Sequence, residues 1–371
     1  MTGGRAVVRS APGKLFVAGE YAVLEPGSPA IVTAVERAVT VTVRASSTRG
    51  VVIVSDLVAD PMRWQWQGAR LRVAPGQDEQ QVRTASAHVV AAVESVAALL
   101  AEHGLPPPRV RIAVESTLHE RGRKFGLGSS GAVTVASVEA LAAHGGLMLS
   151  RPQLLRLALL AGARLDPRGS GGDLAAAVYG GWIAYRAPDR ARVRALARRR
   201  GIAAALRAPW PGLEVTPLPA PRGLRLEVGW TGRPASTARL VGGLHRRGWR
   251  ELAAYKEFVA ASTDLVTAAI DALTGGDDMA LLRQVRLART ELARLDAAVG
   301  LGIFTPELTA LCAAAEAVGG AAKPSGAGGG DCGIALLDAG AADDIARVHR
   351  RWAAGGVRPL FVGPAPERNL P

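Results

Sequence analysis

The sequence predicts a chain of two α+β domains, and three observations support this fold class. The chain has 371 residues, which is more than one domain of ordinary size requires. Hydrophobic residues make up 49% of it and charged residues 21%, the balance of a globular protein. Strand and helix patterns are interleaved without the regular β-α alternation of a doubly wound sheet. A proline-rich change of pattern at 215–223 separates an expected first domain, residues 1–220, from a second, residues 221–371.

The expected first domain combines strands with apolar helices. Residues 30–44 alternate and are β-branched, which predicts a strand pair or hairpin, and residues 109–114 alternate as a further strand. Trp64 and Trp66 alternate on another strand, where we expect them to pack rather than to border a ligand. Apolar residues at helical spacing predict helices at 82–103, 132–143, 154–164 and 173–180, with a charged helix inside 190–221.

The expected second domain has the same mixed character. Alternating apolar residues predict strands at 224–230, 332–337 and 357–362. Helical spacing predicts helices at 236–246, 249–274, 277–299, 305–318 and 341–353. A glycine-rich loop at 323–333 precedes the second of these strands.

Composition narrows the class of protein. The net charge of +13 fits a nucleic-acid binder, but the arginines are dispersed and aromatic residues are only 4%, too few for a base-stacking surface. We therefore expect no nucleic-acid partner; a nucleic-acid binder stays the alternative and would show steeply salt-dependent affinity. Cys312 and Cys332 form neither a disulfide framework nor a metal-ligand pattern. Residues 1–12 lack an apolar signal segment and no uncharged apolar run reaches about 18 residues, so a cytoplasmic protein without a membrane partner is expected.

Lysine usage points to anion sites. The chain has four lysines, so 45 − 4 = 41 of its basic residues are arginine. Where arginine is the default surface cation, a lysine indicates that a compact point charge on a flexible stem is required. Lys14, Lys124 and Lys323 all lie beside or inside glycine-rich segments, whereas Lys256 falls in an expected helix and is interpreted as a surface residue.

The loop at 126–131 has the features of a polyphosphate site. Its glycines let the backbone approach a ligand closely, and the helix that follows directs its amides and positive dipole end at the loop. Ser129 and Ser130 add hydroxyls for phosphate oxygens or a magnesium ion. The loop is not a dinucleotide fingerprint, because Glu139 comes too early to be the acidic residue expected about 20 positions on. Walker and protein-kinase motifs do not occur in the sequence.

Four further segments look suited to anions. Glycines at 326, 328, 329, 330 and 333 give a row of free amides of the kind that makes an anion-binding concavity. Lys14 precedes an apolar strand that leads to Glu20 and Tyr21, and Asp173 stands at the glycine-rich turn 169–172. Ser236 and Thr237 are natural helix N-caps between Arg233 and Arg239.

Together these segments resemble the GHMP kinase superfamily. The resemblance rests on APGKLFVAGEYAVL, KFGLGSSGAV, GSGGDLAAAVYGG, GWTGRPAST and KPSGAGGGDCGIAL, which run in this order from residue 11 to about 336. The resemblance implies an ATP-binding domain with a ribosomal S5 domain 2-like fold, followed by a ferredoxin-like domain. ATP and Mg²⁺ would bind between the two domains. Among members of the superfamily the motifs are most similar to those of kinases acting on phosphomevalonate in isoprenoid biosynthesis.

The resemblance also implies roles for individual residues. The catalytic pair would be Lys14 and Asp173. The ATP-binding residues would be Lys124, Gly126, Leu127, Gly128, Ser129, Ser130 and Gly131, with Ser130 also the metal ligand. The substrate-binding residues would be Lys14, Glu20, Tyr21, Ser170, Asp173, Ser236, Thr237, Ser325, Gly326, Ala327 and Gly328. The sequence departs from the family pattern twice: Gly131 stands where many relatives carry Ala, and no glutamate can be assigned as a second magnesium ligand.

The expected chemistry is transfer of the terminal phosphate of ATP to a small anionic acceptor, in a monomer or homodimer. If the acceptor is a phosphate monoester, its second pKa is about 6, so the nucleophile is already largely ionised at pH 7. Asp173 would then mainly position Lys14 and the acceptor phosphate. Lys124, Arg83, Arg121, Arg123, Arg233 and Arg239 are available to bind the anionic acceptor. The alternatives are another kinase of the superfamily, notably one acting on mevalonate, or a non-catalytic metabolite-sensing relative.

Overall fold

The computed structural model describes residues 6–235, 240, 242 and 253–370, and a large mixed sheet dominates the first part of the chain. Its strand order is β10-β9-β2-β6-β3-β4-β5, with β1 paired to β2 off this path. The β3–β6 pair is parallel and its other pairs are antiparallel. The strands are β1 (Val7–Ala18), β2 (Pro29–Ala45), β3 (Gly50–Ser55), β4 (Val58–Gln67), β5 (Arg70–Val73), β6 (Val110–Ser116), β9 (Trp182–Arg186) and β10 (Glu214–Leu218).

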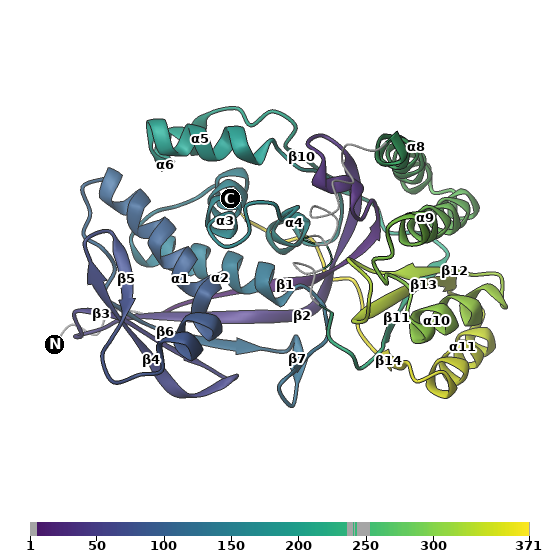
Figure 1. Cartoon of the computed structure of the whole chain (residues 1–371), viewed down its shortest axis with the longest axis horizontal. Coiled ribbons are helices and arrows are strands. Elements are labelled where there is room, and N and C mark those ends of the chain that lie inside the picture. The colour runs from purple at the N-terminus through teal and green to yellow at the C-terminus, as the bar shows by residue number, and fades with distance from the viewer. Residues whose placement is uncertain (1–5, 236–239, 241, 243–252, 371) are drawn as a thin grey trace.

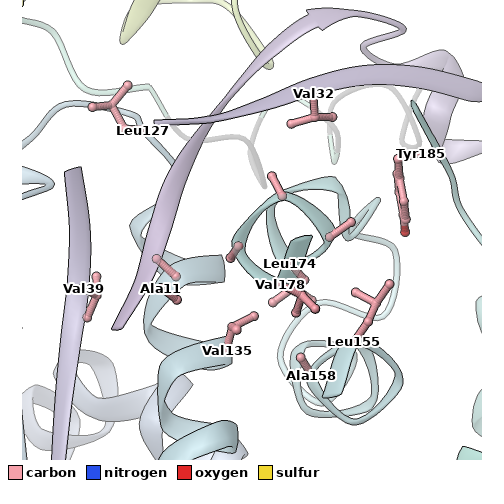
Figure 2. Packing of buried hydrophobic residues seen from close by; sticks show 14 of the residues in the cluster. Ala11, Val32, Val39, Leu127, Val135, Leu155, Ala158, Leu174, Val178 and Tyr185 are labelled. Carbon is pink, nitrogen blue, oxygen red and sulfur yellow. The ribbon is translucent and has the colours of Figure 1, made fainter. Parts of the chain in front are cut away.

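Helices cover the large sheet and pack on one another (Figure 1). They are α1 (Glu79–Glu102), α2 (Ser129–His144), α3 (Arg151–Gly162), α4 (Gly172–Tyr179), α5 (Arg190–Arg200) and α6 (Ile202–Arg207), with a 3-10 turn η1 at Ala22–Leu24. α2 and α4 lie directly against β1 and β2. Because α4 carries a buried run of alanines at 175–177, it can approach both its neighbours and the sheet closely. Figure 2 shows Leu174 and Val178 of α4 in one cluster with Leu155 and Ala158 of α3.

The second part of the chain builds a smaller antiparallel sheet of order β12-β13-β11-β14. Its strands are β11 (Leu224–Trp230), β12 (Ala321–Pro324), β13 (Cys332–Asp338) and β14 (Arg358–Leu360). The helices of this part are α8 (Ala253–Gly275), α9 (Asp278–Val299), α10 (Pro306–Glu316) and α11 (Ala342–Ala354). A short hairpin, β7 (His119–Glu120) and β8 (Arg123–Lys124), precedes α2.

Most of the elements expected from the sequence are present, with instructive differences. The segment 30–44 lies in one long strand, β2, instead of a hairpin, because it pairs with β1, β6 and β9 along its length. The short strands β9 and β12 were not expected, since strands of four or five residues give little periodic signal. The expected helix at 236–246 lies almost entirely outside the described residues, as does the start of the one at 249–274.

The division of the chain at residue 220 stays a prediction. The two sheets support it, because β10, which ends at Leu218, belongs to the large eight-stranded sheet, and β11, which begins at Leu224, belongs to the smaller four-stranded sheet. We propose that boundary with one qualification. After β14 the chain returns to the first part, where Ala365 N donates to Ala34 O at 2.9 Å and Arg368 N donates to Tyr179 O at 2.9 Å.

Two helices in the described chain, α1 and α8, are long and apolar enough to cross a membrane by length and composition alone. In α1, 56% of the most apolar 18-residue window is buried within the protein, and the helix packs against α2 and α3. A core helix passes the same test, and α1 has the contacts of a core helix.

The structure places the two cysteines and the strand tryptophans inside the protein. Cys312 and Cys332 are buried free thiols. Burial raises the pKa of Cys312 to about 11, so its thiol stays protonated at neutral pH. Trp64 is buried in the core, and the Trp66 indole donates to Pro108 O at 3.0 Å, so both serve packing.

Candidate active site

A cavity of about 560 Å³ lies between the part of the chain that forms the large sheet and the part that forms the small sheet. The segments expected to bind phosphate converge on this cavity. Its walls come from β1, the loop before α2, the first turns of α2 and α4, and the loop between β12 and β13. The residues predicted from sequence that line it are Lys14, Glu20, Tyr21, Lys124, Gly126, Gly128, Ser129, Ser130, Gly131, Ser170, Asp173, Gly326 and Ala327. Ser236 and Thr237 lie outside the described residues.

Lys14 lies between two glycine-rich loops. Its backbone amide donates to Leu127 O at 2.8 Å, which holds the first loop against β1. Its side chain crosses Gly128 so closely that a Cβ there would be 2.8 Å from Lys14 Cγ. The Nζ atom is 3.5 Å from Gly126 O and would be 3.7 Å from a Cβ on Gly326. One ammonium group therefore faces both loops from a side chain that is only 9% exposed.

The start of α2 offers free backbone donors. Gly128 is the N-cap, in the left-handed conformation with φ 76°, and it has no side chain to cap the amides that follow. The first backbone hydrogen bond of the helix runs from Ala132 N to Gly128 O at 3.1 Å, so the amides of residues 129–131 have no intrahelical acceptor. Ser129 and Ser130 line the cavity beside these amides, and free amides at a helix N-terminus are donors of the kind that suits phosphate oxygens.

Asp173 stands in the first turn of α4, after a left-handed Gly171 with φ 80°. Its carboxylate lies against the start of α2: a Cβ on Gly131 would be 2.6 Å from Asp173 Oδ2 and 2.9 Å from its carbonyl carbon. A side chain at residue 131 would therefore collide with Asp173, and the glycine lets the carboxylate lie against the first turn of α2.

The loop between β12 and β13 is held in place by the segment after β1. Glu20 forms an ion pair with Lys323, whose side chain is fully buried, and also accepts from Gly326 N at 3.3 Å. The Tyr21 hydroxyl donates to Ala327 O at 2.5 Å, and burial raises the pKa of Tyr21, so this donor keeps its proton. Glu20 and Tyr21 line the cavity, but their polar atoms are engaged with this loop.

Three predicted residues do not line the cavity. Leu127 points into the core and is 1% exposed. The Ser325 hydroxyl is occupied by the backbone of Phe16, donating to its carbonyl at 3.0 Å and accepting from its amide at 2.9 Å. Gly328 packs against Ile303, where a Cβ would be 2.6 Å from the Ile303 carbonyl oxygen. These residues shape the loops that carry the amides.

Several polar residues of the cavity wall were not predicted, and His88 and Asp331 are two of them. Burial on α1 lowers the pKa of His88 and Lys124 lowers it further, while Asp173 opposes the shift, so the imidazole is neutral at pH 7. Asp331, in a left-handed conformation with φ 52°, accepts from Ala235 N at 3.1 Å and packs against Gly126. Burial raises the pKa of Asp331, against the Ala235 amide and the nearby lysines. Asp331 was detectable as the acid inside a glycine-rich loop, whereas His88 gave no local signal.

The arginines proposed for the acceptor lie mostly elsewhere. Arg83 pairs with Glu79 and Arg233 with Glu307, and Arg239 lies outside the described residues. Beyond Gly169 and Ser170 the cavity continues between α3 and α5, where its wall combines apolar side chains with cations. These residues are Leu159, Leu160, Val193, Trp210, Arg190 and Arg194.

A cavity between two α+β units, with glycine-loop amides, lysine ammonium groups and the Asp173 carboxylate on its walls, has the features of a small-molecule phosphotransferase. Comparison with known proteins identifies the family. The chain matches the GHMP kinases N terminal domain over residues 87–181 and the GHMP kinases C terminal domain over residues 270–354. The chain belongs to the GHMP kinase family, as the five sequence motifs indicate, and the expected two-part GHMP kinase fold is confirmed.

Individual relatives cover 90% or more of the chain. A phosphomevalonate kinase of Streptomyces sp. (strain CL190) is 62% identical over 370 residues, 99% of each chain. A mevalonate kinase of Pyrococcus abyssi is 26% identical over 339 residues, 90% of this chain and 89% of that one. Among solved structures, the Lin0012 protein of Listeria innocua superimposes with a TM-score of 0.86 at 30% identity, covering 99% of each chain. Streptococcus pneumoniae phosphomevalonate kinase in complex with phosphomevalonate and AMPPNP gives a TM-score of 0.83 at 27% identity, covering 96% of this chain and 99% of that one.

Proposed function

We propose that this protein transfers the γ-phosphoryl group of ATP to (R)-5-phosphomevalonate, giving 5-diphosphomevalonate for isoprenoid biosynthesis. The observation that carries the proposal is 62% identity, over 99% of both chains, to a phosphomevalonate kinase. The cavity supports it independently, because Lys14, the α2 amides and Asp173 face one space large enough for a nucleotide triphosphate tail and a small acceptor.

The nucleotide phosphates are assigned to the loop 126–131 and the first turn of α2. Mg²⁺ fits this site, because that ion is commonly held by substrate phosphates and one or two protein oxygens rather than by a protein cage. The described residues contain no cluster of three or more His, Cys, Asp or Glu that could hold a metal alone. We assign the Ser130 hydroxyl, with Asp173 close to it across Gly131, as the protein side of the site. When bound, Mg²⁺ neutralises charge on the β- and γ-phosphates.

The residues of the chain position the reactants and stabilise the transferred group. The Lys14 ammonium balances negative charge that spreads over the γ-phosphoryl oxygens in the transition state. Asp173 orients Lys14 and the acceptor. An acceptor phosphate oxygen attacks the γ-phosphorus as the bond to ADP breaks, and since this oxygen is already largely ionised at pH 7, no proton has to be removed. Tyr21 and Glu20 hold the loop at 326–327 over the site, which excludes water.

The acceptor is assigned to the part of the cavity between Asp173 and α5. Ser170 and Lys124 line the same cavity, and we retain Ser236 and Thr237 as candidates. Its apolar wall suits the carbon chain of a mevalonate derivative, and Arg194 offers a cation for a carboxylate. We further propose a cytoplasmic enzyme that acts as a monomer or homodimer, without a nucleic-acid or membrane partner.

A coupled assay of ADP release tests the function directly. Purified protein with ATP and Mg²⁺ is given phosphomevalonate or mevalonate at equal concentration, and Lys14→Met serves as the inactive control. We expect kcat/KM for phosphomevalonate to exceed that for mevalonate by at least about a hundredfold, since a missing phosphate removes several charge-assisted contacts. Preference for mevalonate would make the protein a mevalonate kinase, which relatives such as the one from Pyrococcus abyssi keep open. No ADP release with either acceptor would favour the metabolite-sensing alternative.

A further inference from the structure

The tail segment (residues 363–370) runs back across the large sheet after β14 and ends beside α3 and α4 (Figure 1). It is fixed by backbone hydrogen bonds: Ala365 N donates to Ala34 O at 2.9 Å, and Gly181 N donates to Ala365 O at 3.2 Å. Its contact with the end of α4 is close, because a Cβ on Gly180 would be 2.3 Å from Pro366 O. The segment therefore covers the end of α4 that is opposite the cavity.

Arg368 in this tail segment binds three different elements with one guanidinium group. Its Nη1 donates to Ala177 O of α4 at 2.9 Å. Its Nη2 donates to Ser10 O of β1 at 2.8 Å and to Glu139 Oε2 of α2 at 2.7 Å. The side chains of Arg368 and Glu139 are only 16% and 13% exposed. Glu139 also binds Arg9 of β1 at 3.0 Å, which adds a second link between α2 and β1.

The same three elements carry the residues proposed to act on the phosphates. Lys14 lies four residues after Ser10 on β1, and Asp173 lies four residues before Ala177, one turn earlier on α4. Glu139 is on α2, whose first turn holds Ser130. We propose that Arg368 is a positioning residue that fixes the relative placement of Lys14, Asp173 and the α2 phosphate site from the carboxyl-terminal end of α4.

The physical basis is the shortness of α4 and the strength of the contacts. The last carbonyls of α4 have no intrahelical donor, as at the end of any α-helix, and a cation there binds them and complements the helix dipole. Hydrogen bonds from a charged donor in a partly buried place are stronger than neutral ones. Since α4 moves as a rigid unit, a displacement at Ala177 is transmitted to Asp173.

The inference uses the catalytic assignment under the proposed function and is tested with Arg368→Met, which keeps much of the side-chain volume but none of its donors. Steady-state kinetics are measured at a temperature where circular dichroism shows the folded protein. We expect kcat to fall about tenfold to about a hundredfold, because misplacement by about 1 Å costs rates of that order. The KM for ATP should change less than about threefold, since the loop 126–131 stays intact. Arg368→Lys should recover much of the loss, and Glu139→Gln should lower kcat in the same direction.

Arg289→Met is the matched control, because Arg289 forms a half-buried ion pair with Glu316 far from the cavity. It should leave kcat within about twofold. Arg368→Met with wild-type kcat, or with a loss equal to that of the control, would overturn the inference; so would a loss confined to the KM for ATP. If Arg368→Met does not fold, Arg368→Lys and Glu139→Gln decide the matter by the same criteria. Wild-type protein inactive on phosphomevalonate but active on another acceptor would refute only the proposed function, and the variants would then be compared on that acceptor.

Discussion

The ion pair between Glu20 and Lys323 offers the sharpest test of how the site is built. Sequence resemblance assigns Glu20 to substrate binding, whereas the structure directs its carboxylate at Lys323, whose side chain is 0% exposed. Glu20→Gln keeps the shape and an acceptor for Gly326 N but leaves the Lys323 ammonium buried without a counter-charge. Breaking a buried pair in this way costs about 3–5 kcal/mol of folding free energy. Replacing both partners, with Glu20→Gln and Lys323→Met, should cost at least about 1 kcal/mol less than the sum of the single losses.

Urea denaturation, followed by tryptophan fluorescence, measures the loss of unfolding free energy in each variant. The KM for the acceptor is measured on the same protein preparations under conditions in which each variant is folded. A pair that solvent reaches contributes far less than a fully buried one, so Glu316→Gln, which removes the partner of Arg289 in a half-buried pair, gives the control value. We expect the acceptor KM of Glu20→Gln to stay within about threefold of wild type. A destabilisation below about 1 kcal/mol together with a KM raised tenfold or more would show that the carboxylate serves the substrate, and the reasoning from burial would then be wrong.

Three further changes test other parts of the site. Asp173→Asn should lower kcat about a hundredfold, with no recovery between pH 7 and 9 in initial-rate assays; full recovery at high pH would instead identify a lost general base. Gly128→Ala places a Cβ 2.8 Å from Lys14 Cγ at a position with left-handed backbone. Urea denaturation should therefore show a loss of about 1–2 kcal/mol in unfolding free energy, and kcat should fall at least about tenfold. A wild-type kcat would contradict the close approach of Lys14 to Gly128. Because burial lowers the pKa of His88, the unfolded chain binds its proton more readily, and the free energy of unfolding should decrease as pH falls below about 6.5. His88→Gln should reduce that slope in urea titrations at pH 7.5 and 5.5, and an unchanged slope would count against the burial of the imidazole.

Local sequence predicted the turns to which we assign the phosphates. Gly126 and Gly128 precede the apolar helix α2 and Gly131 lies in its first turn, a pattern that favours a tight turn with free amides, and Asp173 follows a similar glycine-rich turn. Most helices followed from apolar spacing for the same reason, since each requires only neighbours three and four residues apart. Family membership followed from the order of these motifs, and the comparisons confirm it.

Contacts between distant segments were decided only by the tertiary structure. Glu20 and Lys323 are 303 residues apart, and the two residues joined by the Arg368–Ser10 bond are 358 apart, so neither pairing leaves a periodic trace in the chain. In the sequence His88 is one residue of an expected helix with no motif around it. Only the fold brings it near Asp173 and Lys124. Spacing along the chain determines which backbone turns form, because that energy is local. Which side chains meet inside the protein is determined by burial against whatever segment the completed fold brings there.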